Sequence, residues 1–262
     1  GRLLWSRDLP GRADAVFPIG STLVGVTGSA GEVTVLDARS GARVGEPVAA
    51  MVLSQGRVAA AAAGRFLYVV TNSGTLKSLD PARAAEPWAV KLDAFGEGTL
   101  CDLAVGEGVV AVVRTGRGIQ AFDALTGEVL GSGKPTGEGG IAAVSVWPGP
   151  LIVAACPAGG GWRLSALDLA KGPEAAWELH FSKAGDIVVA HAQEDKVFVR
   201  VTLSSKAVLA GSPATLVASV DRATGKRDWE HGIPDGRVTP RVSVQGGRLC
   251  LSVDDKMYLF GK

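Results

Sequence analysis

Residues 119–131 read IQAFDALTGEVLG, and versions of this pattern occur five times in the chain of 262 residues. Each copy has alternating apolar residues that end in an Asp, and most copies continue with two variable residues and Ser/Thr-Gly. The five aspartates are Asp37, Asp80, Asp123, Asp168 and Asp221. They are 43, 43, 45 and 53 residues apart, and a period of this length is typical of one four-stranded propeller blade.

Each part of the pattern has a physical reason. The alternating segment predicts a strand with one buried face, and the Asp carboxylate accepts backbone N–H groups of the turn that follows. Glycine suits a left-handed position at the end of such a hairpin loop; the glycines are Gly41, Gly127 and Gly225. The next strand carries Trp in three copies and Gly in the other two; these residues are Trp88, Trp177, Trp229, Gly45 and Gly131.

Two further strands are expected upstream of each Asp. The second of them is a continuous apolar run, which predicts a strand buried on both faces. Six such runs occur, at Leu23–Val26, Phe66–Val70, Val109–Val113, Leu151–Ala155, Val197–Val201 and Leu249–Val253. Each blade therefore has an inner strand, a buried strand, a strand ending in the Asp turn, and an outer strand.

The sequence thus predicts an all-β fold, a six-bladed β-propeller of four-stranded antiparallel blades. We expect one domain over residues 1–262, with blades at about 11–48, 49–93, 94–136, 137–182, 183–234 and 235–262. The last blade lacks an outer strand, and the opening GRLLW matches GKRDW at Gly225–Trp229. Gly1–Pro10 is therefore expected to pair with the last blade and close a complete ring, which hides exposed strand edges.

The repeated LDxxTGxxxW pattern resembles the quinoprotein-type, or PQQ-like, propeller repeat over the whole chain. It is less like a WD40 repeat, because no GH…WD pairs occur. The family includes quinone-dependent dehydrogenases, the propeller lipoprotein of the outer-membrane β-barrel assembly machine, and sensor domains of bacterial kinases. The dehydrogenases would imply a vicinal Cys pair and a calcium site, whereas Cys101, Cys156 and Cys250 are isolated. We therefore expect a non-catalytic member with no cofactor, no catalytic residue and no metal site.

Composition and charge limit the kinds of partner that the protein can bind. Hydrophobic residues make up 47% of the chain, enough for a substantial core, and the formal net charge is +1. A near-neutral surface argues against nucleic acid as a partner, and the apolar runs are too short for membrane insertion. No signal peptide is visible, so a bacterial periplasmic or other extracytoplasmic location and the cytoplasm stay as alternatives.

We expect the interaction surface on the loops that join the buried strand to the third strand and on those that join adjacent blades. Arg and Trp are favoured at the centres of interfaces, and insertions in a repeat array often form a binding face. The candidate partner-binding residues are Arg114, Arg117, Trp162, Val208, Leu209, Arg237 and Arg241. Val208 and Leu209 belong to the insertion that makes the fifth blade long.

Three functions follow from this reading. We expect first a scaffold or accessory subunit that presents loops to another protein. The second hypothesis is a ligand-sensing domain of a larger bacterial receptor or kinase, which would bind a small molecule in the channel. The third is a six-bladed hydrolase or lactonase, which would require metal-binding side chains at the channel mouth. The sequence does not identify the partner, the ligand or the oligomeric state.

Overall fold

The computed structural model describes 17 segments of the chain. They are residues 4–8, 13–53, 58–93, 100–106, 108–114, 117–133, 141, 143–147, 151–168, 175–182, 184–193, 195–203, 208, 214–233, 241–245, 248–253 and 256–260. The described strands form six antiparallel sheets, and none of the helices in these segments has the length and hydropathy of a membrane span. The fold is all-β, as predicted, and its four-stranded sheets are consistent with a β-propeller.

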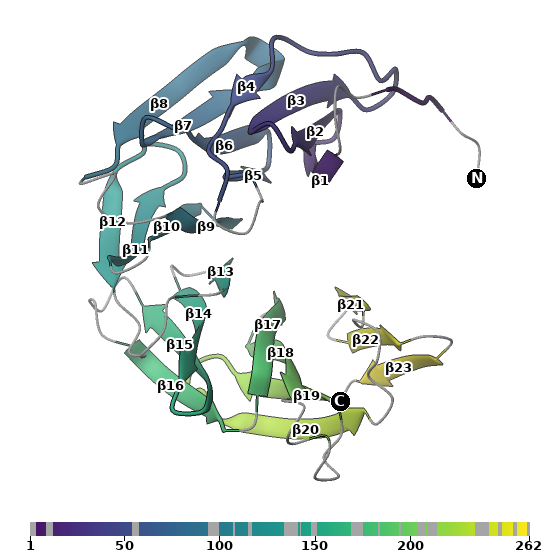
Figure 1. Ribbon diagram of the computed structural model, residues 1–262, viewed down its shortest axis with the longest axis vertical. Helices are drawn as coiled ribbons and strands as arrows, with labels where there is room; N and C mark the ends of the chain where they lie inside the picture. The colour runs from purple at the N-terminus through teal and green to yellow at the C-terminus, as the bar shows by residue number, and fades with distance from the viewer. Residues whose placement is uncertain are drawn as a thin grey trace. The chain divides into compact units, whose positions relative to one another are not determined.

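The chain divides into two compact units, and the first comprises Gly1–Lys134 with Pro148–Pro150. Its three sheets each have four strands in chain order (Figure 1). Sheet 1 contains β1 (Ala13–Ile19), β2 (Leu23–Gly28), β3 (Glu32–Asp37) and β4 (Val48–Ala49). Sheet 2 contains β5 (Ala60–Ala63), β6 (Phe66–Val70), β7 (Thr75–Asp80) and β8 (Ala85–Lys91). Sheet 3 contains β9 (Leu100–Gly106), β10 (Val109–Arg114), β11 (Gly118–Asp123) and β12 (Val129–Gly133).

The second unit comprises Pro135–Trp147 with Leu151–Lys262. Sheet 4 contains β13 (Ala143–Trp147), β14 (Leu151–Ala158), β15 (Gly161–Asp168) and β16 (Ala175–Phe181). Sheet 5 contains β17 (Ala184–Gln193), β18 (Lys196–Leu203), β19 (Thr215–Asp221) and β20 (Arg227–Ile233). Sheet 6 has three strands among the described residues, β21 (Arg241–Gln245), β22 (Arg248–Val253) and β23 (Lys256–Phe260).

The predicted strand order within a repeat is confirmed. All five aspartates of the repeat are the last residues of the third strands β3, β7, β11, β15 and β19. The second strand of sheet 3, β10, is buried at all six positions. Its two faces both lie against protein, which explains why the sequence shows an unbroken apolar run there.

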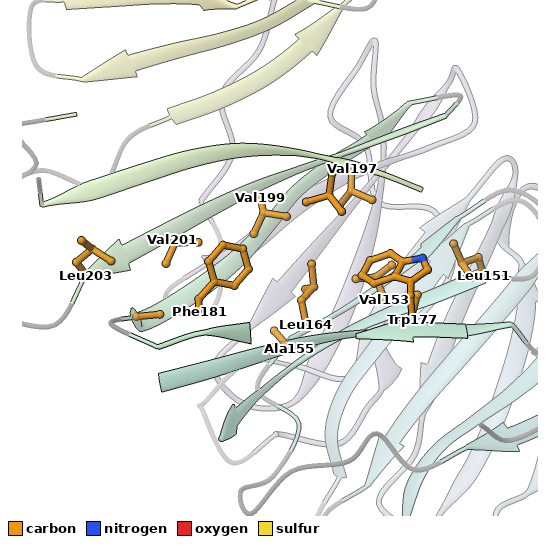
Figure 2. Packing of buried hydrophobic residues seen from close by; sticks show 13 residues of the cluster. Leu151, Val153, Ala155, Leu164, Trp177, Phe181, Val197, Val199, Val201 and Leu203 are labelled. Atoms are coloured by element: carbon orange, nitrogen blue, oxygen red, sulfur yellow. The ribbon is translucent and has the colours of Figure 1, made fainter. Parts of the chain in front are cut away.

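Neighbouring sheets within a unit pack face to face through alternate residues of these buried strands. In the second unit, Leu151, Val153 and Ala155 of β14 belong to one core cluster with Val197, Val199 and Val201 of β18 (Figure 2). In the first unit, one cluster joins sheets 1 and 2 and another joins sheets 2 and 3. Burial of these apolar faces is the main favourable contribution to folding.

The predicted Asp-Gly turns are confirmed in three copies. The Oδ1 atom of Asp123 accepts the backbone N–H groups of Leu125 at 2.9 Å and Thr126 at 2.8 Å. Asp37 accepts two backbone N–H groups in the same way, and Asp221 accepts that of Thr224. The φ angles of the glycines are +70° at Gly41, +75° at Gly127 and +71° at Gly225.

The turn of sheet 2 differs from these three. Asp80 is followed by the 3-10 helix Pro81–Arg83 and makes no side-chain cap. Its carboxylate lies 3.2 Å from Nε of Arg65 instead, and Ala84 takes the left-handed position at φ +50°. Pro81 has no N–H to donate. In the Asp123 turn the residue at this position, Ala124, donates its N–H to the Gly108 carbonyl.

A tryptophan from another part of the chain packs against the glycine of each regular turn. Trp88 of sheet 2 donates its Nε1–H to the Ala124 carbonyl of sheet 3 at 3.0 Å, and Trp177 of sheet 4 donates to the Arg222 carbonyl of sheet 5 at 2.7 Å. A Cβ atom on Gly127 or Gly225 would lie within 2.7 Å of the indole ring above it. Two features therefore require glycine at this position of the turn: the positive φ angle, and the neighbouring indole ring, which leaves no room for a Cβ atom.

The N-terminal segment makes the same contact with sheet 1. Trp5 donates to the Ala38 carbonyl at 3.0 Å, and its ring lies 2.7 Å from the position of a Cβ on Gly41. Leu4–Asp8 is described without strand structure, and the rest of Gly1–Pro10 lies outside the described residues. The predicted pairing of this segment with the last blade, the closed ring and the single domain with its blade limits stay predictions.

Candidate functional site

Two of the predicted interaction residues meet at one cavity in the first unit. Arg114 is the last residue of β10, and Arg117 precedes β11 in the hairpin between these strands. The cavity has a volume of about 230 Å³. It is lined by Asp93, Arg114, Arg117, Gly118, Ile119, Gln120 and Ser132.

Three segments build this cavity because of the antiparallel register of sheet 3. Arg114 pairs with Gly118 across the β10–β11 hairpin, and Gln120 of β11 pairs with Ser132 of β12. Asp93 comes from the segment that follows β8 of sheet 2. The cavity therefore lies where the connection from sheet 2 meets the loop edge of sheet 3.

Arg114 is unusual because its charged side chain is largely buried, although it lies at a loop edge of the sheet. The residue is only 8% exposed, and its guanidinium donates Nη1–H to the Asp93 backbone carbonyl and Nη2–H to Oε1 of Gln120, the latter at 3.3 Å. Both acceptors are neutral. These bonds use two of the five N–H donors of the side chain.

The electrostatic environment of Arg114 disfavours its charge. Burial lowers the pKa of the Arg114 guanidinium, and the positive charge of Arg117 lowers it further, whereas the Asp93 carboxylate acts in the opposite direction. Arg117 itself is exposed at the cavity rim. Two arginine residues and the Asp93 carboxylate thus line one cavity.

The other predicted interaction residues are not brought together with this cavity. Trp162 in β15 is half-buried and packs against the core of sheets 4 and 5. Val208 is 38% exposed. Arg241 begins β21, and its side chain is outside the described part; Leu209 and Arg237 lie outside the described residues altogether.

A second cavity lies where two residues of the repeat pattern, a Trp and a Gly, are replaced by other residues. Its volume is about 310 Å³, and it lies between sheets 1 and 2 beside Gly45, Asp80 and Ala84. Gly45 stands where β8, β16 and β20 carry Trp, and Ala84 stands where the Asp37, Asp123 and Asp221 turns carry Gly. The Cβ of Ala84 would crowd an indole in the position seen at Gly127, so the two departures from the repeat compensate each other.

Within the described residues, no group of three or more His, Cys, Asp or Glu side chains is arranged to hold a metal ion. Burial raises the pKa of the Cys156 thiol to about 11. A thiol with such a pKa carries little thiolate at neutral pH and is a poor nucleophile.

Sequence reasoning identified the two arginines of the first cavity and missed Asp93 and Gln120, which bind Arg114. Asp93, Gln120 and Ser132 have no motif of their own, and strand register brings Gln120 and Ser132 to the cavity. Pairing of β11 with β12 could have been inferred from the hairpin, which would have placed Ser132 opposite Gln120.

Comparison with known proteins identifies the family. The family model described as outer membrane protein assembly factor BamB matches residues 29–256. A search of the curated proteins finds no match to the chain.

Solved structures share the fold at low sequence identity. BamB from Moraxella catarrhalis superposes with a TM-score of 0.64 at 18% identity, over 98% of this chain and 74% of that one. A chain of the mitotic checkpoint complex gives a TM-score of 0.64 at 14% identity, over 99% of this chain and 78% of that one.

A quinohemoprotein alcohol dehydrogenase from Pseudomonas putida HK5, ADHIIG, gives a TM-score of 0.52 at 16% identity. The match covers 84% of this chain and only 41% of the dehydrogenase. The repeat pattern, the stacked antiparallel sheets and the family match agree with one another. The chain belongs to the family of the outer membrane protein assembly factor BamB, whose members are built from PQQ-like propeller repeats.

Proposed function

We propose that the protein is a non-catalytic interaction scaffold, an accessory subunit that presents its surface to another protein. The observation that carries this proposal is a set of three exposed apolar residues in the β11–β12 hairpin of sheet 3. Leu125 in the Asp123 turn is 68% exposed, and Val129 and Leu130 of β12 are 56% and 41% exposed. Three large exposed apolar residues within one hairpin are a candidate site for contact with another protein, because exposed apolar surface often marks interaction sites.

Family membership supports the same function. The family description names an assembly factor, and the similar checkpoint chain comes from the structure of a protein complex. A fold alone does not determine function, so the surface itself has to be tested. Arg39 offers a matched control, because it has the position in the Asp37 turn that Leu125 has in the Asp123 turn.

The experiment is photo-crosslinking in the cells that produce the protein. A benzophenone amino acid is placed at Leu125 in one variant and at Arg39 in another, and adducts are identified by mass spectrometry. We expect one protein to be captured at Leu125 but not at Arg39, and the Leu130→Asp change to reduce its co-purification. Equal capture at both sites, or none at Leu125, would contradict the proposal.

We propose further that the protein is not an enzyme and binds no pyrroloquinoline quinone. The sequence lacks the vicinal Cys pair that the dehydrogenase resemblance implies, and Cys156 is buried. Titration of the purified protein with the quinone, followed by visible absorption, is expected to show no saturable binding at micromolar concentration. Saturable binding, or a stoichiometric metal in elemental analysis, would overturn this part.

The finer architecture is also a proposal. We propose six blades in one ring, with Gly1–Pro10 as the fourth strand beside β23. Support comes from Trp5, which contacts the Asp37 turn as Trp88 and Trp177 of fourth strands contact the turns of the following sheets. Trp5 therefore stands where the fourth strand of a preceding sheet would place it.

A further inference from the structure

The Asp80 turn of sheet 2 is more open than the three regular turns of the repeat. The glycines of the regular turns are buried, and an indole ring packs against each of them. Ala84, which has the corresponding position in the Asp80 turn, is exposed, and the cavity of about 310 Å³ lies beside it. The described residues of this turn therefore leave a hollow where three equivalent turns hold an indole.

The cavity combines apolar walls with acceptors for a hydrogen bond. Its apolar lining residues include Val35, Val44, Val48, Leu79 and Pro81. Pro81 has the position in its turn that Ala124 has in a regular turn, where the Ala124 carbonyl accepts the Nε1–H of Trp88 at 3.0 Å. The Pro81 carbonyl accepts the Ala84 N–H at 3.5 Å, which is long for a hydrogen bond. Asp80 also lines the cavity and is 2% exposed, and its Oδ1 atom has no hydrogen-bond partner in the described part of the chain. The turn thus retains acceptor capacity for an N–H donor.

We propose that this cavity binds the side chain of a tryptophan from a partner protein. An indole combines a flat apolar ring with one N–H donor, and the apolar walls and the Pro81 carbonyl match both features. The protein itself covers three equivalent turns in this way, with Trp5, Trp88 and Trp177. Tryptophan is also among the residues that most often anchor a protein interface by filling a pocket of the partner.

The cavity has room for the ring, although not in the position seen at Gly127. The Cβ atom of Ala84 crowds that position, whereas beside Gly45 the described residues place no heavy atom within 4 Å of a Cβ. We therefore expect the bound indole to be displaced from Ala84 towards Gly45. The volume of about 310 Å³ is at the lower end of the range of about 300–1,000 Å³ for ligand pockets, which suits one ring system rather than a larger ligand.

The test is an NMR titration of the intact protein, following the backbone amides of Gly45 and Ala85. The probes are free indole and the blocked peptide acetyl-Gly-Trp-Gly-amide, together with its versions that carry Phe or 1-methyl-Trp in place of Trp. We expect saturable shifts with the Trp peptide and weaker binding of the Phe peptide. The 1-methyl-Trp peptide lacks the indole N–H and should bind about two- to tenfold more weakly, which is the net value of one hydrogen bond. Saturation with indole but not with the Trp peptide would assign the cavity to a small molecule and overturn the proposed source.

The inference rests on the proposed function, since the occupant belongs to a partner protein, but it concerns a different sheet from the Leu125 hairpin. The two tests therefore fail separately. Capture of a protein at Leu125 without peptide binding at the Asp80 turn would overturn this inference alone. Peptide binding without capture at Leu125 would support this inference and contradict the hairpin surface alone.

Variants of the cavity walls make the site assignment falsifiable. Val44→Asp places a charge in the apolar wall and should abolish binding, whereas Val16→Asp, at a 66% exposed position of β1 away from the cavity lining, should leave it unchanged. Ala85→Phe fills the cavity from an exposed position and should also block the peptide, so it keeps the test valid if Val44→Asp fails to fold. Ala84→Gly removes the crowding Cβ and should tighten binding. Non-saturable shifts, unchanged binding by Ala85→Phe, or weaker binding by Ala84→Gly would overturn the proposal.

Discussion

The glycine of each regular turn has two requirements that can be separated by mutation. Gly127 has φ +75° and an indole ring 2.7 Å from the position of its missing Cβ, whereas Gly45 has φ +71° and no heavy atom within 4 Å of that position. An L-residue in the left-handed region costs about 1–2 kcal/mol, which applies to both glycines. Only Gly127 also has a ring that must move.

We therefore expect Gly127→Ala to lower the free energy of unfolding more than Gly45→Ala does. Gly45→Ala should cost about 1–2 kcal/mol from backbone strain, and Gly127→Ala should lose a further 1–3 kcal/mol, roughly, from overpacking against Trp88. Urea denaturation of the two variants measures the difference directly. Equal losses would show that the indole ring adapts without strain.

The turn aspartates predict how stability depends on pH. The pKa of Asp37 is lowered by hydrogen bonds from the Ser40 hydroxyl and backbone, that of Asp123 by the backbone N–H of Thr126, and that of Asp221 by the Thr224 hydroxyl. Each folded-state pKa thus lies below the unfolded value of about 3.9. The stabilisation is present above that value and is lost as the pH falls through the folded-state pKa.

Acid titration of stability tests this prediction at one turn. The free energy of unfolding of the native protein should exceed that of Asp123→Asn at pH 7, and the difference should shrink as the pH falls below about 4. Chemical denaturation at a series of pH values provides the measurement. Parallel curves for the two proteins down to pH 2 would mean that the charge of Asp123 does not stabilise the turn.

At the scale of the element, one carbonyl group accepts two hydrogen bonds at the contact between sheets 2 and 3. The backbone oxygen of Ala124 accepts both the Nε1–H of Trp88 at 3.0 Å and the hydroxyl of Tyr68 at 3.1 Å. Both bonds are buried, and the two rings lie 5.9 Å apart. Either donor alone keeps the carbonyl paired, so the loss of one is less harmful than the loss of both.

A double-mutant cycle is therefore expected to be non-additive. Trp88→Phe and Tyr68→Phe should each cost about 0.5–1.5 kcal/mol, the net value of one hydrogen bond. The double variant should cost more than the sum, because an unpaired buried carbonyl carries a penalty of about 1–3 kcal/mol. Thermal or urea unfolding gives the coupling energy, and strict additivity would refute the shared role of this carbonyl.

The elements also show what the sequence could and could not predict. Strands such as β10 and turns such as that of Asp123 were predictable because hydrophobic period and turn chemistry are local. The turn after Asp80 was harder, since Pro81 and Ala84 change its geometry within an otherwise matching repeat. The cavity at Arg114 needed the register that places Ser132 opposite Gln120, and this register depends on pairing between strands.

At the scale of the whole molecule, the position of Trp5 cannot be explained by its local sequence alone. Its contact with the Asp37 turn equals those of Trp88 and Trp177, which come from fourth strands, and Arg7 adds a bond to the Gly41 carbonyl at 3.0 Å. If Gly1–Pro10 is the fourth strand beside β23, its removal takes away two things at once. The Asp37 turn loses its indole cover, and β23 gains an open edge.

Two variants separate these losses. Trp5→Ala removes only the indole and should behave as a large-to-small change at a half-buried site, with a modest drop in melting temperature. Deletion of residues 1–10 should cause a markedly larger drop or aggregation, because an unpaired strand edge recruits other chains. Gly127→Val, which disturbs one turn, should stay soluble with a smaller drop than the deletion. Calorimetry and size-exclusion chromatography provide the comparison. If the truncated protein stays monomeric and melts like Trp5→Ala, the segment contributes only its indole, and the N-terminal strand does not close the ring.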